Sequence, residues 1–207
     1  MMTLLYEEKL KALEQLCRER TLCKECSLRY PKVKYVFGSG NPNAQLMFIG
    51  EGPGLEENRT GIPFTGRSGK VLDRMIEYAG IRRKDVYLTN VVKCRPMKDP
   101  ARPASPHNLR APSKNEIEAC LPVLNKQIEI VRPYVICTLG TLPAQVLLET
   151  QKNINELHGM LAEYDGIRLI PTYHPGTVMR SPWLREAVVS DMRKVKEELA
   201  LVSQILV

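Results

Sequence analysis

Four of the six cysteines have a spacing that suits a metal centre. Cys23 and Cys26 form a Cys-x-x-Cys pair on one short loop, and Cys94 and Cys120 follow much later in the chain. Four soft thiolates can bind zinc in a tetrahedral site or hold a [4Fe-4S] cluster, since both centres take four such ligands. Uninvolved thiols packed in the core are the third interpretation, and spacing alone leaves all three open.

Three further motifs contain residue types that commonly bind ligands through their side chains or backbone amides. They are GEGPGLEEN at residues 50–58, the pair Thr89-Asn90, and the run Tyr173-His174-Pro175. Glycines after a strand let backbone amides approach a ligand closely, although GEGPGLEEN matches neither common nucleotide-binding motif. Taken singly, each motif has an ordinary alternative: a tight turn, a capping asparagine, or a histidine hydrogen-bonded within its loop.

The elements that must position these motifs alternate between buried strands and helices. Apolar runs predict four strands, in QLMFIG, DVYLTNVV, YVICTLG and RLIPTYH. Helical spacing of Leu4, Leu5, Leu10, Leu13 and Leu16 predicts a first helix that runs to about Cys17. Further helices are predicted in KVLDRMIEYAG, which Gly80 closes, and in SKNEIEACLPVLNKQIEIV, which Ser113 opens together with Glu116. The last two are TLPAQVLLE and a helix from Pro182 to about Leu201. This alternation predicts one domain over residues 1–207, a three-layer α/β/α sandwich with a central four-stranded parallel sheet.

Two segments interrupt the alternation. Residues 51–69 are too rich in glycine and proline for us to expect regular structure, and residues 97–114 form a long proline-rich insertion. Loops of that length are usually functional or mobile. Ligands of open parallel sheets bind at the carboxyl ends of the strands. Because the three motifs follow three of the predicted strands, we expect them to meet at one edge of the sheet.

Composition and charge narrow the class of protein. Hydrophobic residues make up 43% and charged residues 26%, as in soluble globular proteins, and no apolar run reaches the roughly 18 residues of a membrane span. The N-terminus lacks the pattern of a secretory or transit peptide, so we expect a cytoplasmic protein whose thiols are free of disulfides. We also expect a monomer with no membrane partner. The net charge of +7 favours a polyanionic partner such as nucleic acid.

Together, three stretches resemble the signature motifs of the family-4 uracil-DNA glycosylases, iron-sulfur enzymes of the uracil-DNA glycosylase superfamily. They are GEGPGLEENRTGIPFTGRSG, TNVVKCRP and TYHPGTVMRSP, and with the cysteines they follow the family's order along nearly the whole chain. The resemblance implies a DNA repair enzyme that flips deoxyuridine out of single- or double-stranded DNA and hydrolyses its N-glycosidic bond. Uracil and an abasic site would be the products, and a monofunctional hydrolase needs no Schiff-base lysine.

The resemblance also selects a [4Fe-4S] cluster, with a structural role, on Cys23, Cys26, Cys94 and Cys120. Cys17 and Cys137 are then interpreted as packing residues.

Roles in recognising and releasing the base follow from the same resemblance. Asn90 would read the Watson-Crick edge of uracil, because a carboxamide offers a donor and an acceptor in one plane. Phe64 would stack on the flipped base. His174 would donate a hydrogen bond to O2 of uracil, where negative charge develops as the base leaves.

The remaining roles concern the sugar, the thymine methyl group and the DNA backbone. The resemblance places Glu51 and the backbone amide of Gly52 against the uracil and its sugar, with Glu51 assisting water. Glu57 would wall off C5 of uracil, where the methyl group of thymine would clash. The expected DNA-contacting residues are Arg67, Met179 and Arg180.

Two rival functions stay open. A related branch, the uracil-DNA cross-linking proteins, has an extended loop at the insertion whose histidine attacks C1′ of the sugar and stays attached. His107 lies in this insertion, but within Ala-Ser-Pro-His rather than the Lys-Arg-Arg-Ile-His run of that branch. The second rival is an α/β enzyme with a structural zinc that acts on a small phosphorylated substrate.

Overall fold

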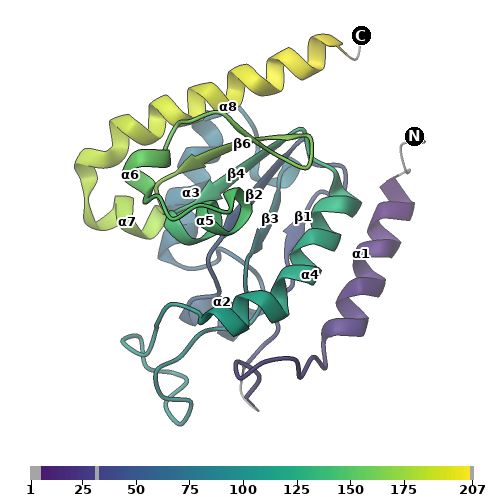
Figure 1. The fold of residues 1–207 in the computed structure, drawn as a ribbon, viewed down its shortest axis with the longest axis vertical. Helices are drawn as coiled ribbons and strands as arrows, with labels where there is room; N and C mark the ends of the chain where they lie inside the picture. Colours follow the sequence, from purple (N-terminus) through teal and green to yellow (C-terminus); the bar gives the residue numbers. More distant parts are fainter. Residues whose placement is uncertain (1–5, 31–32, 206–207) are drawn as a thin grey trace.

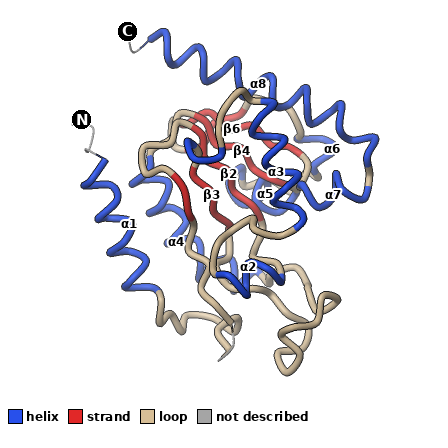
Figure 2. The backbone as a smooth tube through the Cα atoms, turned by 180° about the vertical axis from the view of Figure 1, so that it is seen from behind, coloured by secondary structure: helices blue, strands red, loops and turns tan. Residues whose placement is uncertain are grey.

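A six-stranded sheet lies at the centre of the protein, between two layers of helices (Figures 1 and 2). The structure, a computed structural model, describes residues 6–30 and 33–205. The strands are β1 (Ser39–Gly40), β2 (Leu46–Gly50), β3 (Tyr87–Asn90), β4 (Val135–Leu139), β5 (Ala162–Tyr164) and β6 (Ile167–Thr172). Their spatial order is β1-β3-β2-β4-β6-β5.

The four predicted strands form the parallel centre of this sheet, which confirms the predicted fold class. β3, β2, β4 and β6 pair in parallel, and each is buried almost throughout. The sequence analysis missed the two edge strands, β1 and β5, which pair antiparallel with β3 and β6. They have only two and three residues and are partly exposed, so they carry no apolar run.

Helices cover both faces of the sheet. They are α1 (Tyr6–Arg20), α2 (Leu55–Thr60), α3 (Arg67–Tyr78), α4 (Lys114–Val131), α5 (Thr141–Leu148), α6 (Ile154–Leu157), α7 (Pro175–Arg180) and α8 (Arg185–Ile205), with 3-10 turns η1 (Arg83–Asp85) and η2 (Pro182–Leu184). Met47 and Ile49 of β2 pack in one core with α1 and α4, whereas Leu46 and Phe48 pack in the other with α3 and α8. This two-sided burial explains why β2 is apolar throughout.

Local signals fixed several helix ends correctly. Ser113 and Glu116 form the predicted capping box at the start of α4, and Gly80, with φ of +74°, follows α3. α1 continues to Arg20, beyond the predicted end at Cys17. The predicted helical positions Leu4 and Leu5 lie outside the described residues.

The expectation of irregular structure over residues 51–69 is wrong. This segment contains α2 and the first turn of α3, because three of its glycines, Gly54, Gly61 and Gly66, are helix caps rather than positions inside a helix. Gly54 is the extended N-cap of α2, and Gly61, with φ of +85°, is its left-handed C-cap. The final predicted helix is also divided, with η2 before α8. None of the helices in the described ranges has the length and apolar character of a membrane span.

Candidate active site

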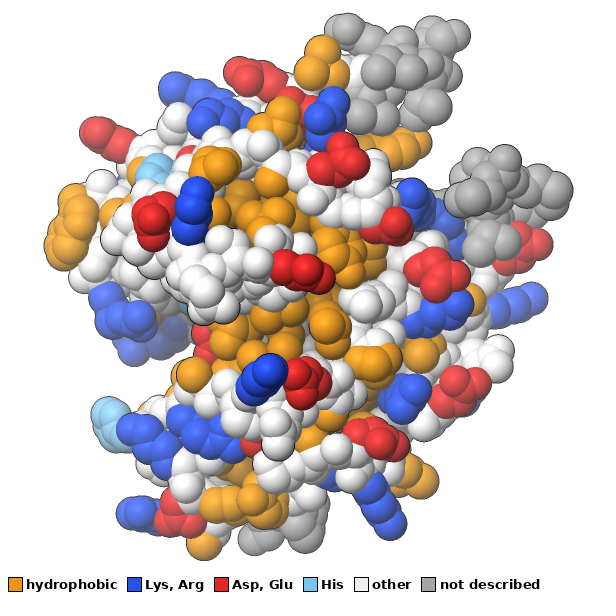
Figure 3. Space-filling view, in the orientation of Figure 1, with side chains coloured by type: hydrophobic (Ala, Val, Ile, Leu, Met, Phe, Trp, Pro, Cys, Tyr) orange, Lys and Arg blue, Asp and Glu red, His pale blue; other side chains and the backbone are white. Residues whose placement is uncertain are grey.

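A cavity of about 670 Å³ lies at the carboxyl ends of the parallel strands. Gly50 and Asn90 are paired at the ends of β2 and β3, and His174 follows β6. All nine pocket residues predicted from the sequence line this cavity: Glu51, Gly52, Glu57, Phe64, Arg67, Asn90, His174, Met179 and Arg180. Figure 3 shows a hollow at the left of the molecule with Lys and Arg side chains on both sides. The three motifs therefore meet in one concave site.

Gly50 is the point where the Phe64 ring and the Asn90 amide come together. A methyl group on Gly50 would lie 2.5 Å from Asn90 Oδ1 and 2.7 Å from Phe64 Cζ. Both side chains therefore lie against the bare Cα of Gly50, and any larger residue there would push them apart. Phe64 and Asn90 are buried, at 6% and 2% exposed. A planar ring and a planar amide thus share one corner of the cavity.

Asn90 is held through its backbone, which leaves its side chain free. The fully buried Lys93 donates from Nζ to the Asn90 carbonyl oxygen at 2.5 Å and to Thr89 Oγ1 at 2.8 Å. Burial lowers the pKa of Lys93 to about 7. Within the described ranges the Asn90 carboxamide has no hydrogen-bond partner, so both its donor and its acceptor are available to a ligand.

His174 has a fixed ring orientation because it caps α7. Its Nδ1 accepts a hydrogen bond from the Gly176 amide at 3.0 Å, so the proton of the neutral ring belongs on Nε2. Burial, together with the positive charge of Arg180, lowers the pKa of His174 to about 4. Near neutral pH the cavity therefore holds a neutral imidazole whose Nε2–H is a hydrogen-bond donor.

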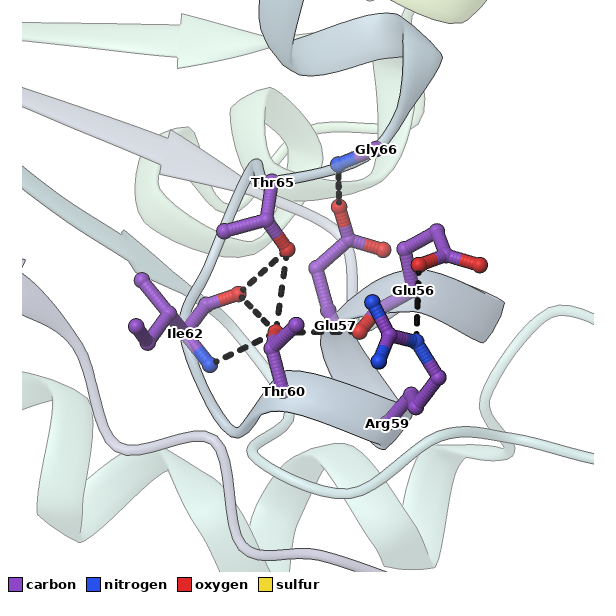
Figure 4. A network of polar contacts seen from close by, with 7 residues as sticks. All are labelled: Glu56, Glu57, Arg59, Thr60, Ile62, Thr65 and Gly66. Carbon is purple, nitrogen blue, oxygen red and sulfur yellow. Dashed lines mark hydrogen bonds and ion pairs between the residues drawn. The ribbon is translucent and has the colours of Figure 1, made fainter.

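The two glutamates differ in their surroundings. Burial raises the pKa of Glu51, which directly follows β2. Glu57 instead braces the backbone: its Oε1 accepts from the Gly66 amide at 2.9 Å (Figure 4). A methyl group on Gly54 would lie 2.6 Å from Glu57 Oε2, so this carboxylate fills the space between α2 and α3. Burial thus alters the acidity of Glu51, whereas Glu57 is held in the cavity wall by its contact with Gly66.

The loop after α2 is closed by hydroxyl contacts. Thr60 Oγ1 lies 3.0 Å from Thr65 Oγ1 and accepts from the Ile62 amide at 3.2 Å (Figure 4). These contacts hold the two ends of the segment 60–65, which carries Phe64.

Several lining residues were missed. They include Pro96, Pro106 and Leu109 beside or within the insertion, and Leu139, Gly140 and Thr141 at the end of β4. The strand-end rule could have found the β4 group, because it applies equally to that strand. A methyl group on Gly140 would lie 3.1 Å from His174 Cβ, which shows how closely this turn packs against the histidine. No comparable signal marked the insertion as a cavity wall.

The insertion is folded back on the protein by a buried arginine. Arg95, 1% exposed, donates to the carbonyl oxygens of Pro103 at 2.6 Å and Ser105 at 2.9 Å. Met97 and Leu109 form an isolated bridge across its base. His107 is exposed and is absent from the cavity lining within the described chain. The insertion thus contributes apolar side chains to the cavity rather than its histidine.

The four predicted cysteine ligands gather in a second region, which we call the cysteine corner. It comprises the loop after α1 with Cys23 and Cys26, the turn after β3 with Cys94, and Cys120 of α4. Burial, followed by the proximity of Cys120, Cys26 and Cys23, raises the pKa of the Cys94 thiol to about 12. Burial likewise raises the pKa of Cys26 and Cys120.

Glu116 ties the segments of the cysteine corner together. Its buried carboxylate accepts from Ser27 Oγ at 2.7 Å, beside Cys26, and from Arg110 Nη2 at 2.6 Å, at the end of the insertion. The hydrogen bonds from Arg110 hold the pKa of Glu116 down at about 2. One ionised side chain therefore links the loop after α1, the insertion and α4.

The donor set of the cysteine corner fits a centre that binds thiolates. Burial, and then the proximity of neighbouring thiols, raises the pKa of Cys26, Cys94 and Cys120, and a cationic iron centre would reverse that penalty. Among the described residues, no three His, Cys, Asp or Glu side chains converge on the position of a single metal ion. Cys137 is fully buried in β4, and Cys17 packs against the core, in agreement with their predicted packing roles.

Comparisons with known proteins place this geometry among related chains. The sequence model of the family described as the uracil DNA glycosylase superfamily matches residues 37–194. The type-4 uracil-DNA glycosylase of Archaeoglobus fulgidus is 38% identical over 196 residues, covering 91% of this chain and 94% of the relative. That of Thermotoga maritima is 40% identical over 178 residues, covering 84% and 88%. A type-5 uracil-DNA glycosylase of Pyrobaculum aerophilum is 29% identical over 153 residues, covering 66% and 63%.

Proposed function

Because the chain belongs to the uracil DNA glycosylase superfamily, and within it to the type-4 uracil-DNA glycosylases, we propose that it excises uracil from DNA. This membership confirms the resemblance that the three motifs predicted. The proposed reaction is hydrolysis of the bond between N1 of uracil and C1′ of deoxyribose. Water adds to C1′, the bonding electron pair leaves with uracil, and an abasic site remains in the DNA.

Recognition of an everted uracil rests on the corner of the cavity at Gly50. The Phe64 ring offers a face for stacking, and the Asn90 carboxamide offers a donor for O4 and an acceptor for N3–H. Cytosine carries a donor where uracil carries O4, so a fixed amide disfavours it. The hydrogen bond from Lys93 to the Asn90 carbonyl supports this proposal, because it restrains the backbone from which the amide projects.

His174 is proposed to stabilise the leaving base. Negative charge develops on O2 and N1 of uracil as the bond breaks, and a donor aimed at O2 lowers the energy of that state. The Gly176 amide fixes the Nε2–H tautomer, and the lowered pKa keeps the ring neutral. A neutral donor stabilises the developing anion without transferring a proton to it.

Glu51 is proposed to serve the sugar side of the reaction. Its carboxylate would orient water and stabilise positive charge on the sugar, and the water proton would pass through it to solvent. The backbone amide of Gly52, which also lines the cavity, would position the base and sugar beside Glu51. Burial raises the pKa of Glu51, which makes this carboxylate a stronger base than an exposed glutamate.

The remaining roles concern specificity and DNA. Glu57, held by Gly66, is proposed to occupy the space that the thymine methyl group would need. Arg67 lines the cavity from the start of α3, and Met179 and Arg180 line it from the end of α7; we propose that all three contact DNA around the flipped nucleotide. Cys23, Cys26, Cys94 and Cys120 would hold a [4Fe-4S] cluster that pins the loop after α1 and the turn after β3 to α4.

The observation that carries this proposal is the convergence of Phe64, Asn90 and His174 in one cavity. The test is a single-uracil oligonucleotide followed by alkaline cleavage at abasic sites. Asn90→Ala should lower the rate of uracil release by about tenfold or more, since a buried recognition pair is worth 1–3 kcal/mol. Asn43→Ala, an exposed asparagine before β2, is the matched control and should keep full activity. Equal rates for the two variants would contradict the proposal.

The same assay separates the rival functions. Covalent capture through His107 would give a protein–DNA band on a denaturing gel that disappears in His107→Ala, whereas a hydrolase turns over and leaves free abasic DNA. Metal analysis addresses the small-substrate rival, for which zinc without iron would be the expected result.

A further inference from the structure

Phe64 has a backbone conformation that is rare for an aromatic residue. Its φ is +54°, in the left-handed region that costs energy for any residue with a Cβ atom. Three other described non-glycine residues have positive φ. Arg132 and Glu149 end helices α4 and α5, and Asp165 lies in the turn between β5 and β6. Phe64 is the member of this set that lines the cavity.

Arg83 makes the polar contacts that oppose this strain. From η1, its guanidinium donates to the Phe64 carbonyl oxygen at 2.9 Å and to the Pro63 carbonyl oxygen at 3.3 Å. Its other terminal nitrogen pairs with Asp73 of α3 at 2.5 Å. The guanidinium serves the two carbonyls from one nitrogen and the carboxylate from the other, in a fixed planar geometry that the single nitrogen of an ammonium group cannot reproduce. Arg83 therefore connects the strained peptide to the body of α3.

The packing around Phe64 shows why the conformation matters. A methyl group on Gly69 would lie 1.9 Å from the Phe64 oxygen, so this carbonyl is pressed against the backbone of α3. At the other end of the residue, the ring lies against Gly50 beside Asn90. A change of the Phe64 backbone away from positive φ would move the carbonyl and the ring together and withdraw the ring from Asn90.

We propose that Arg83 is a positioning residue that holds Phe64 in its left-handed conformation, so that the ring faces an everted pyrimidine in the cavity. This inference rests on the proposed function, because it takes Phe64 as the stacking residue. Arg83 itself is absent from the cavity lining within the described residues, so it acts through Phe64 rather than on the substrate.

A double-mutant cycle with the single-uracil oligonucleotide tests this coupling. Phe64→Ala should lower kcat/KM by about tenfold or more through loss of stacking. Arg83→Met should lower it by about tenfold with Phe64 present and by less than about twofold in the Phe64→Ala background. Arg82→Met is the matched control: Arg82 pairs with Asp85 on the surface, so its loss should leave kcat/KM unchanged.

Arg83→Lys keeps a cation beside Asp73 but lacks the two terminal nitrogens of the guanidinium. It should give an intermediate loss of kcat/KM, and this loss should also vanish in the Phe64→Ala background. It replaces Arg83→Met in the cycle if that variant does not fold, as judged by circular dichroism. Equal losses in both backgrounds, or no loss with Phe64 present, would overturn the inference while leaving the proposed function intact. Full activity of Phe64→Ala would instead remove the stacking role itself, and the inference with it.

Discussion

The cavity and the cysteine corner are built in different ways. The cavity is formed at the ends of parallel strands, where Gly50 and Gly140 let Asn90, Phe64 and His174 pack closely. The cysteine corner joins segments far apart in the sequence through a few polar contacts, with Glu116 at their centre. Close packing orients groups for chemistry without further help, whereas buried thiols with raised pKa values need a cation to be stable as thiolates.

The two regions meet at Lys93. Its ammonium group donates to the Asn90 carbonyl oxygen, and its backbone amide donates to Cys120 Sγ at 3.3 Å. Lys93 therefore contacts both the backbone of Asn90 and the cysteine corner. The comparison predicts that damage to the cavity changes catalysis at nearly constant stability, and that damage to the cysteine corner changes stability first.

The largest expected effect is on catalysis in His174→Ala. Loss of the donor to O2 should lower kcat for uracil release by about 10²- to 10³-fold, as for other donors to a developing anion. Loss of the α7 cap should reduce the free energy of unfolding by only about 1 kcal/mol. Single-turnover kinetics and denaturant unfolding measure the two effects. His107→Ala is the histidine control and should turn over normally; a loss of less than tenfold in His174→Ala would break the comparison.

Sequence patterns predicted the cavity better than its surroundings. Burial on both faces makes the central strands continuous apolar runs, and the strand-end rule then brings Asn90 and His174 together. α2 was missed because Gly54 and Gly61 mark its ends, and composition does not distinguish a glycine at a helix end from one inside a loop. The edge strands were missed because pairing with a neighbour, rather than their own residues, defines them.

The inner supports of the site could not be predicted for a different reason. Nothing in the sequence marks Lys93 as fully buried, because a lysine is usually exposed. The oxygens of Thr89 and Asn90 that satisfy its ammonium group take up their positions only in the folded chain. The insertion wall depends on where the buried Arg95 side chain points, which is a property of the tertiary structure. Arg83 and Phe64 are 19 residues apart, so their contact is equally hidden.

The second expected effect concerns stability in Cys120→Ser. A serine hydroxyl is a poor iron ligand, so the variant should lose iron and about 3 kcal/mol or more of unfolding free energy. Folded molecules that remain should keep kcat within about tenfold, because the cavity is built by packing. Iron analysis, denaturant unfolding and active-site-normalised kcat measure these outcomes. Cys17→Ser, outside the proposed ligand set, should keep its iron; full iron in Cys120→Ser would contradict the assignment.

The third expected effect is a shift of the acidic limb of the kcat profile. Burial raises the pKa of Glu51 above 4.5, whereas the pKa of His174 is lowered to about 4, so Glu51 gains its proton first as the pH falls. Below that point the carboxylate is lost, and below about pH 4 the neutral imidazole is lost as well. Glu51→Gln should therefore have lower activity and a remaining limb near pH 4.

Short assays after a pH jump make the acidic limb of the kcat profile report on groups of the cavity rather than on the cysteine corner. Burial raises the pKa of the Cys26, Cys94 and Cys120 thiols, to about 12 for Cys94, so these three do not titrate in the acidic range when free of metal. An unchanged limb in Glu51→Gln would mean that another group controls the profile, and the proton role of Glu51 would be wrong.

The smallest expected effect is on substrate binding at the insertion wall. Leu109 is 48% exposed and lines the cavity, so DNA should cover part of its side chain on binding. Complete burial of a leucine is worth about 1.5–3 kcal/mol, and covering part of the side chain should contribute less than 1 kcal/mol. Leu109→Ala should therefore raise KM by about twofold to threefold with kcat unchanged, the pattern of an interaction made equally before and during the reaction.

Leu161, 49% exposed and away from the cavity, makes Leu161→Ala the matched control, and its KM should not change. The contacts of the insertion decide how a change in KM or in kcat is interpreted. The insertion is held by Arg95 on one side and by Glu116 through Arg110 on the other, so it belongs to the cysteine corner by its supports and to the cavity by its contacts. A tenfold fall in kcat for Leu109→Ala would mean that the insertion takes part in the bond-breaking step, and the division between a catalytic cavity and a structural corner would no longer hold.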